Sequence, residues 1–419
     1  MARLIYSILL YLITPLIWLR LLWRARLQPA YLRNLPERYG FYQQSAPDKL
    51  IWVHAVSVGE TRAAQPLIEG LQAQWPGYQI LLTGMTPTGR EAGLQVYGDT
   101  VIQAYLPYDY PGAVSRFFRH FSPALGVLME TEIWPNLLAA ATKAEVPVML
   151  ANARLSARSA RGYGKFDALV RPAFRALSGV AAQTQGDAER LQGLGVGEVA
   201  VVGNLKFDVT PSPEKIALGQ SWRTALGLRP VFLAASTREG EEVLILEAWR
   251  QNPAGDAMLV IVPRHPQRFD SVASLLEPSG MVVKRRSQGL PDANTQIWLG
   301  DSMGEMAAYY AMADLAYVGG SLLPLGGQNL IEAAACDCPV LVGPHTFNFL
   351  QATEDAIAAG AARRVDTAEI LAATVHSLFL AKIELAAMRS SASHFARSHQ
   401  GAAGRMVNLI SRWSGQAAR

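Results

Sequence analysis

The sequence predicts an α/β chain of two doubly wound parallel sheets, preceded by an apolar helix. Three observations predict this fold class. Short apolar stretches alternate with helix-like stretches twice along the chain, and polar motifs follow the apolar stretches. Strands buried on both faces of a parallel sheet read as short apolar runs, and ligands bind beyond their carboxyl ends. The length of 419 residues also exceeds that of one ordinary domain.

The composition is that of a folded chain. Apolar residues make up 50% of it and charged residues 17%, which excludes a disordered protein. The formal net charge of +4 suits anionic partners, but no basic run with interleaved aromatic residues is present, so nucleic acid is not an expected partner. The two cysteines, Cys336 and Cys338, favour neither a disulfide framework nor a four-ligand zinc site.

The N-terminal stretch 4–23 is apolar, with Arg20 as its only charge. Its length could just span a bilayer, but Pro15 and Arg20 weaken a full crossing. We therefore expect residues 1–30 to form a membrane-attached helix, either a single span or an interfacial helix; a buried core helix is the alternative. Four arginines that follow are expected to face anionic lipid on the cytoplasmic side: Arg24, Arg26, Arg33 and Arg38.

Residues 31–208 form the first predicted sheet domain. Its expected strands are 51–56, 78–83, 101–106, 124–129, 146–151 and 179–182, with a further apolar stretch at 199–202. Because the carboxyl ends of parallel strands share one edge, the polar residues behind them should line one site. These residues are His54, Ser57, Glu60, Thr86, Thr88, Glu130, Glu132, Asn152 and Arg154.

Glu60 is the residue that we expect to abstract a proton. It follows an apolar strand on a glycine-containing loop, where partial desolvation would raise the pKa of a carboxyl toward that of a working base. The alternative is that Glu60 only complements the dipole of the helix that begins there. Arg154, Arg158 and Arg161 recur at helical spacing and form either a cationic face for an anionic acceptor or ordinary solvated surface.

Two prolines in the segment 203–213 mark a domain boundary, which we place between residues 208 and 209. The second predicted domain, 209–419, has expected strands at 231–235, 258–262, 281–283, 297–299, 315–318 and 340–342, with helices closing it from about residue 353. Polar residues that could reach one ligand at its strand ends are Ser236, Arg264, His265, Ser302, Glu305 and Asn329.

The segment 300–332 carries the clearest ligand signal, because four glycines, at 319, 320, 326 and 327, precede a helix expected to open near Gln328. Glycines let backbone pass close to a ligand, and a helix N-terminus offers free N–H groups to a phosphate. Glu332, inside that helix, could hold a ribose hydroxyl pair. The alternative is an ordinary strand-to-helix turn. Neither D-x-D nor H-E-x-x-H occurs, so no dedicated metal site or cofactor is expected, and positive groups would neutralise a leaving phosphate.

Several local strings resemble one known family. They are H-A-V-S-V-G-E (54–60), M-T-P-T-G (85–89), M-E-T-E-I-W-P-N (129–136), N-A-R-L-S (152–156), G-N-L-K-F-D (203–208), P-R-H-P (263–266) and G-G-Q-N-L-I-E (326–332). Together they resemble the 3-deoxy-D-manno-octulosonic acid (Kdo) transferases of lipopolysaccharide synthesis, which have the GT-B architecture of two Rossmann-like domains facing a cleft. The resemblance covers nearly the whole chain.

The resemblance implies transfer of Kdo from CMP-Kdo to the lipid A precursor, at the cytoplasmic face of the inner membrane and without a metal. Glu60 would then deprotonate the acceptor hydroxyl. Residues matching the CMP-sugar site would be Ser236, Arg264, His265, Met303, Gly304, Glu305, Asn329, Glu332 and Lys206, of which Arg264 and Lys206 would face phosphate. The acceptor-binding candidates are Ser57, Thr86, Thr88, Glu130 and Arg154.

Two other functions fit the same fold. A nucleotide-sugar epimerase would need neither a lipid nor the apolar segment 1–26, and a non-catalytic membrane-associated nucleotide binder would not need the polar motifs of the first domain. The number of Kdo units transferred is left open by the sequence.

Overall fold

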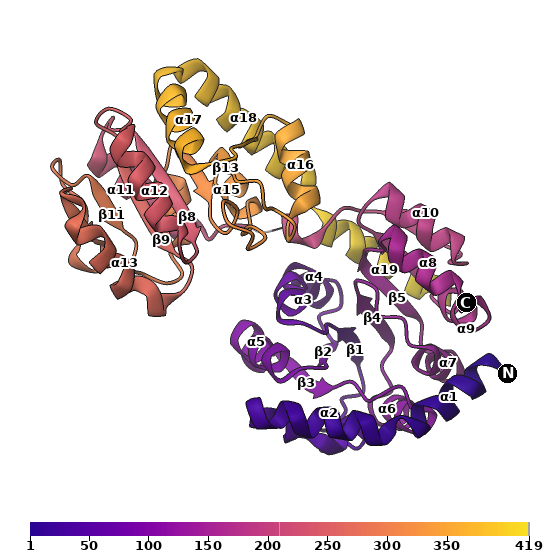
Figure 1. The fold of residues 1–419 in the computed structure, drawn as a ribbon. Coiled ribbons are helices and arrows are strands. Elements are labelled where there is room, and N and C mark those ends of the chain that lie inside the picture. The colour runs from indigo at the N-terminus through magenta and orange to yellow at the C-terminus, as the bar shows by residue number, and fades with distance from the viewer. Residues whose placement is uncertain (209, 418–419) are drawn as a thin grey trace. The chain divides into compact units, whose positions relative to one another are not determined.

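The computed structural model describes residues 1–208 and 210–417, which divide into two compact units. The first unit comprises Met1–Asp208 and Gly401–Arg419, and the second comprises Val209–Gln400. Each is built on a parallel sheet of seven strands with helices packed against it (Figure 1). The predicted class of two doubly wound α/β domains is therefore confirmed.

The sheet of the first unit is buried on both faces. Leu50 and Trp52 pack into one apolar cluster, whereas Ile51 and Val53, which alternate with them, pack into the opposite one. The strand order is β3-β2-β1-β4-β5-β6-β7. The strands are β1 (Leu50–His54), β2 (Gln79–Gly84), β3 (Val101–Tyr105), β4 (Leu125–Met129), β5 (Val148–Ala153), β6 (Gly179–Ala182) and β7 (Val199–Val201).

Helices join these strands in the alternation that the sequence predicts. They are α3 (Val58–Ala63), α4 (Gln65–Gln74), α5 (Pro87–Tyr97), α6 (Pro111–Phe121), α7 (Pro135–Lys143), α8 (Ala157–Gly164), α9 (Asp167–Arg175) and α10 (Gln185–Gly193). Two short 3₁₀ turns matter for the site described below, η2 (Leu35–Tyr39) and η4 (Leu205–Phe207).

The N-terminal segment forms two helices, α1 (Ala2–Leu12) and α2 (Thr14–Leu27), bent by 49°. Pro15, at the start of α2, has no N–H with which to continue the ladder of α1. Polar side chains fix the inner face: Ser7 Oγ accepts from Asn136 Nδ2 over 3.0 Å, and the Thr14 and Tyr110 hydroxyls lie 2.8 Å apart. The outer face is apolar and exposed, so the alternative of a buried core helix is wrong.

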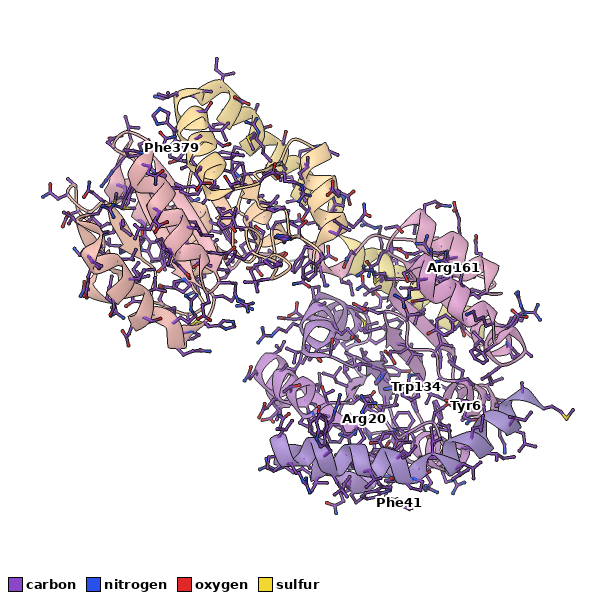
Figure 2. The ribbon with its side chains drawn as sticks, in the orientation of Figure 1. Tyr6, Arg20, Phe41, Trp134, Arg161 and Phe379 are labelled. Carbon is purple, nitrogen blue, oxygen red and sulfur yellow. The ribbon has the colours of Figure 1, made fainter. Side chains whose placement is uncertain are left out.

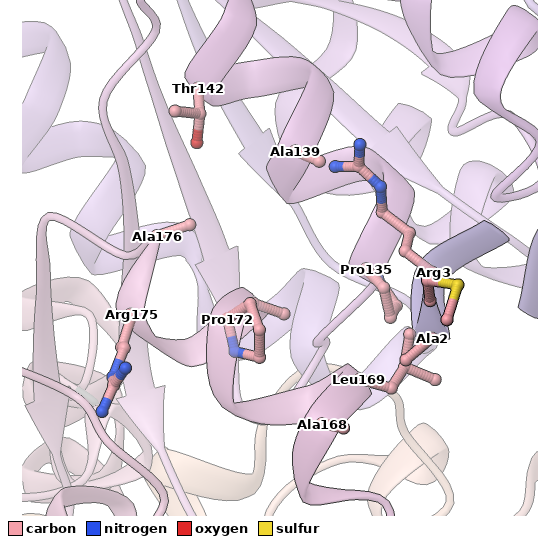
Figure 3. Close-up of a pocket in the computed structure, with 12 residues that line it drawn as sticks. Ala2, Arg3, Pro135, Ala139, Thr142, Ala168, Leu169, Pro172, Arg175 and Ala176 are labelled. Carbon is pink, nitrogen blue, oxygen red and sulfur yellow. The ribbon is translucent and has the colours of Figure 1, made fainter.

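No single helix among the described residues is long and apolar enough to cross a membrane. Two pairs of helices joined at a bend are long and apolar enough when each pair is taken together, by length and composition alone. They are α1 with α2, and the C-terminal segments 368–380 and 382–415. Where α1 packs near α7 and α9 it leaves a pocket of ≈ 640 Å³, lined mostly by small apolar side chains together with Arg3 and Arg175 (Figure 3).

The last helix, α19 (Ala402–Ala417), belongs to the first unit and not, as the sequence division 209–419 had it, to the second. Its apolar stripe, Met406, Ile410 and Trp413, packs into the core of the first sheet. The Asp208 carboxylate accepts backbone N–H groups at the start of this helix. These bonds join α19 to the end of the segment Met1–Asp208. The boundary between residues 208 and 209 is itself as predicted.

The second sheet has the order β10-β11-β9-β8-β12-β13-β14. Its strands are β8 (Val231–Thr237), β9 (Met258–Pro263), β10 (Val283–Arg285), β11 (Ile297–Leu299), β12 (Leu315–Val318), β13 (Val340–Val342) and β14 (Ala362–Arg364). Two edge strands differ from expectation. The strand β10 begins two residues later than predicted, and β14 was expected to be helical. Both have three residues and carry arginines, so their apolar signal is weak.

The helices of the second unit are α11 (Pro213–Leu226), α12 (Glu241–Gln251), α13 (Phe269–Leu276), α14 (Met306–Met312), α15 (Ile331–Ala335), α16 (Leu350–Ala358), α17 (Ala368–Leu380) and α18 (Lys382–His399). The helix after the glycine loop is shorter than expected and starts later, at Ile331 instead of near Gln328. Gly326 and Gly327, which both have positive φ, belong to the loop before it, and the Asn329 side chain accepts the Ile331 N–H at the later start of the helix.

Candidate active site

The first unit gathers its polar motifs at one edge of the sheet. Glu60 follows β1, Thr86 follows β2, Glu130 follows β4 and Arg154 follows β5. These four strands are neighbours, in the order β2-β1-β4-β5, and all run parallel. The structure therefore brings together the residues that the sequence placed at a common strand edge.

Glu60 is held by its own loop and helix. Its Oε2 accepts the Val56 N–H over 2.9 Å, and its Oε1 accepts the Ser57 hydroxyl over 2.8 Å. Ser57 caps α3 in return by accepting the Glu60 N–H. Glu60 therefore does stabilise the N-terminus of α3, as the alternative interpretation expected. Its carboxylate can still act as a base, because each oxygen has a further lone pair with which to accept a proton.

Two more glutamates stand near Glu60. The pKa of Glu130 is raised by burial and by the charge of Glu60, while Lys206 and Arg154 oppose the shift. The pKa of Glu132 is also raised, mainly by burial, although a hydrogen bond from Trp134 Nε1 (2.8 Å) favours its charged form. A partly buried cluster of carboxylates with two cations can accept and move protons.

Lys206 lies in this first cluster, in η4 of the first unit. The backbone explains its position, because the Asn152 side chain, at the end of β5, accepts the N–H of Leu205 over 3.1 Å. Asn152 and Glu130 both have positive φ, 53° and 56°, a conformation that costs free energy outside glycine. Strain at two neighbouring strand ends is typical of a functional site.

The remaining acceptor candidates are less enclosed. Thr86 caps α5 by accepting the Gly89 N–H over 3.1 Å, and Thr88 is exposed. Arg158 and Arg161 lie exposed on α8, as Figure 2 shows for Arg161, so this pair is solvated surface. His54 is buried within β1, with its Nδ1 2.9 Å from Thr83 Oγ1, and burial lowers its pKa to about 4.

The glycine loop of the second unit is organised by Glu241, which is not among the site residues predicted from the sequence. Glu241 is fully buried, and its carboxylate accepts the Gly320 N–H (2.7 Å), the Tyr317 hydroxyl (2.5 Å) and the Leu322 N–H (3.2 Å). Glu241 lies in the charged string S-T-R-E-G-E-E, and such a string is typical of solvent-exposed surface. The signal that the sequence offered was its position at the start of the helix that follows the buried strand β8.

Glycine is required at Gly319, because a β-carbon there would lie 2.4 Å from the Ser236 carbonyl oxygen. The loop also closes on itself, since the Gly327 N–H donates to the Gly320 carbonyl over 2.7 Å. Ser236 has a φ of 54° at the end of β8, another strained strand end.

Glu332 lies in the first turn of α15 and accepts from Asn329 Nδ2 over 3.1 Å. Burial raises its pKa, whereas the Asn329 hydrogen bond and the charge of Arg264 oppose the rise. His265 follows β9 beside Arg264, and burial together with Arg238, Arg264 and Arg268 lowers its pKa. Asn329, Glu332, Arg264 and His265 therefore form one group at the strand ends, as predicted.

The other predicted residues follow the neighbouring strand β11. The Ser302 hydroxyl lies 2.9 Å from the Tyr309 hydroxyl, and Glu305 pairs with Arg286 over 3.1 Å. The second carboxylate oxygen of Glu305 is buried and has no hydrogen-bond partner. Gly304 has a φ of 74°, and Met303 beside it is 60% exposed. Within the described chain, no three His, Cys, Asp or Glu side chains group so as to hold a metal ion.

Comparisons with known proteins point to one family. Residues 33–209 match the family model described as 3-Deoxy-D-manno-octulosonic-acid transferase (kdotransferase). A 3-deoxy-D-manno-octulosonic acid transferase of Bordetella pertussis is 44% identical, covering 99% of this chain and 100% of that protein. A transferase of the same description from Haemophilus influenzae is 38% identical over 98% of both chains. The structure is also similar to UDP-GlcNAc 2-epimerase of Neisseria meningitidis, with a TM-score of 0.57, 17% identity, and coverage of 87% of this chain and 100% of that one.

Proposed function

This chain belongs to the Kdo transferase family of lipopolysaccharide biosynthesis, and on that premise we propose that it transfers Kdo from CMP-Kdo to the lipid A precursor, lipid IVA, without a metal. The observation that carries the proposal is the 44% identity to a Kdo transferase along almost the whole of both chains. The epimerase likeness reflects a shared fold, because 17% identity carries no activity with it.

In the proposed reaction Glu60 is the general base. Its carboxylate takes the proton of the acceptor hydroxyl as that oxygen attacks the anomeric carbon of Kdo, the bond to the phosphate of CMP breaks, and CMP leaves. The Val56 N–H and the Ser57 hydroxyl orient the carboxylate, each through one oxygen. Glu130 and Arg154 beside it are candidates for binding the acceptor sugar.

The second unit is proposed to hold CMP-Kdo. The partly buried carboxylate of Glu332, fixed by Asn329, is suited to the two hydroxyls of a ribose. Arg264 and His265 supply positive charge and a hydrogen-bond donor for the phosphate, whose negative charge grows as CMP leaves. The hydrogen bonds of Glu241 fix the glycine loop, so the entropic cost of ordering this loop on nucleotide binding is reduced.

We further propose that the protein lies on the cytoplasmic face of the inner membrane through α1 and α2. The outer faces of these helices expose large apolar side chains, among them Leu4 (65%), Leu19 (63%) and Trp23 (62%). Because Ser7 and Thr14 hold the inner faces to the first unit, interfacial attachment fits the contacts better than a crossing helix. An acceptor that is a lipid requires the enzyme to work at such a surface.

Incubation of the protein with CMP-Kdo and lipid IVA in excess EDTA, followed by mass spectrometry, tests the proposal. We expect a product heavier than the acceptor by one or more Kdo residues, together with free CMP. If the acceptor stays unmodified in EDTA but is modified when Mg²⁺ is added, the proposal that transfer is independent of a metal is wrong. Consumption of CMP-Kdo without any change of the acceptor would overturn the transferase proposal.

A further inference from the structure

Arg38 is a buried cation with unused hydrogen-bond donors. Its side chain, in η2, is only 2% exposed; Nη1 donates to the Met85 carbonyl over 3.1 Å, but Nε and Nη2 have no partner. The guanidinium stacks on the Tyr105 ring, 4.2 Å from its centroid. Within the described residues no carboxylate forms an ion pair with it. The adjacent Glu37 is engaged by Arg90 at 2.7 Å. An unpaired buried charge is unfavourable unless something binds to it.

Arg38 lines a pocket of ≈ 460 Å³ beneath α2. Arg20 and Arg24 reach the same pocket from α2, and Figure 2 shows Arg20 with Trp134, another lining residue, on the sheet side of that helix. Glu132 is the one carboxylate among the described residues that line this pocket, and it accepts a hydrogen bond from Trp134 Nε1. Three guanidinium groups against one carboxylate make the pocket strongly attractive to an anion.

The pocket also joins two surfaces that the proposed reaction needs. One wall is α2, whose opposite side exposes Leu19 and Trp23. The other wall includes Val56 and Thr86, at the carboxyl ends of β1 and β2, and the Val56 N–H is the one that Glu60 accepts. A group bound here would therefore lie between the apolar outer face of the helix and the loop of the candidate base.

We propose that this pocket binds a phosphate monoester of the lipid acceptor, with Arg38 as the fixed partner and with Arg20 and Arg24 closing around it. The inference rests on the proposed function, in which the acceptor is a phosphorylated lipid. A phosphate monoester carries close to two negative charges near neutral pH and three acceptor oxygens, which match the two unused donors of Arg38 and the two further guanidinium groups. Anchoring the phosphate would hold the acceptor sugar beside Glu60.

The test measures binding of lipid IVA and of its enzymatically dephosphorylated form to the full-length protein in detergent, with no donor present. We expect the phosphorylated form to bind at least about tenfold more tightly, and Arg38→Gln and Arg20→Gln to lose most of that difference. Arg119→Gln, which removes an exposed charge of the same unit on α6, is the matched control and should bind like the native protein. Because no donor is present, this result stands even if transfer is never observed.

Two further measurements separate the acceptor from other sources of phosphate and from a structural role. In steady-state assays Arg38→Gln should raise the KM for the acceptor while kcat and the KM for CMP-Kdo stay unchanged. Flotation on phosphatidylcholine vesicles containing phosphatidic acid should be equal for Arg38→Gln and Arg119→Gln. Equal binding of both acceptor forms, or a loss of flotation confined to Arg38→Gln and Arg20→Gln, would overturn the proposal, the latter assigning the pocket to a membrane phospholipid.

Discussion

The backbone N–H of Val56 lies 2.9 Å from Oε2 of Glu60, so Val56, in the turn between β1 and α3, both holds the candidate base and lines the arginine pocket beneath α2. One short turn therefore links the chemistry proposed for Glu60 to the face of the first unit that carries the exposed apolar helices.

Replacing Glu60 by Gln should lower the rate of Kdo transfer by about 10²–10⁴-fold, because the amide cannot take the acceptor proton. The amide oxygen can still accept one of the two bonds from Val56 and Ser57, so the free energy of unfolding should fall by no more than about 1–2 kcal/mol. Rates come from product mass spectrometry and stability from urea unfolding. Glu69→Gln, an exposed change in the same unit, is the control, and native-like turnover of Glu60→Gln would remove it from the base role.

Glu332→Ala should weaken CMP binding by about tenfold, because the alanine offers the ribose hydroxyls no acceptor. Calorimetric titration of the full-length protein with CMP measures the change. Glu277→Ala, at an exposed position of the second unit, should bind CMP like the native protein. An unchanged affinity of Glu332→Ala would refute the nucleotide contact.

Glu241→Gln should destabilise the second unit by about 2–4 kcal/mol, because a buried charged acceptor shared by several donors is replaced by a neutral amide. The loop that Glu241 holds carries Gly320, so CMP affinity should fall as well. Urea unfolding and calorimetry report the two effects. The exposed neighbour Glu239 gives the matched variant Glu239→Gln; if both variants behave alike, the buried network does not fix the loop.

Stability should fall as the pH drops from about 6.5 to about 4, because burial lowers the pKa of His54 from its usual 6.5 to about 4. In this pH range the unfolded chain binds a proton on His54 and the folded chain does not. The contribution of neutral His54 to the free energy of unfolding is therefore complete above pH 6.5 and is lost progressively as the pH falls to about 4. The loss can reach roughly 3 kcal/mol. His54→Gln should flatten the pH profile of urea unfolding in this window, whereas the exposed His394→Gln should leave the profile unchanged.

The combined change Leu4→Ser, Ile8→Ser and Leu19→Ser should lower partitioning onto phosphatidylglycerol-containing vesicles by at least about a hundredfold, since each apolar side chain contributes about 1.5–3 kcal/mol when buried. All three side chains are at least half exposed on α1 or α2. Leu228→Ser with Ile383→Ser, at exposed positions of the second unit, is the control. Equal flotation of both variants would argue against attachment through these helices.

Particular residues show how far the sequence could predict the site. Glu130 and Arg154 were predicted because each directly follows a buried strand, and Glu60 because it lies in the first turn of the helix after β1; the carboxyl ends of neighbouring parallel strands lie at one edge of the sheet. Arg38 was expected among the arginines that face lipid, yet it is buried. The residues around Arg38 in the sequence do not indicate that it is buried, because its burial depends on the packing of η2 against Tyr105 and Tyr108.

The sequence by itself determined the two α/β sheets, the boundary after residue 208, the strand-end motifs and the family resemblance, since each depends on short-range patterns of apolar, glycine and polar residues. Only the tertiary structure decided the place of α19 in the first unit, the Glu241 network behind the glycine loop, and the arginine pocket between α2 and the sheet. Those features depend on contacts between residues far apart in the chain, such as Asp208 with Gly401 and Glu241 with Gly320, which local patterns do not encode.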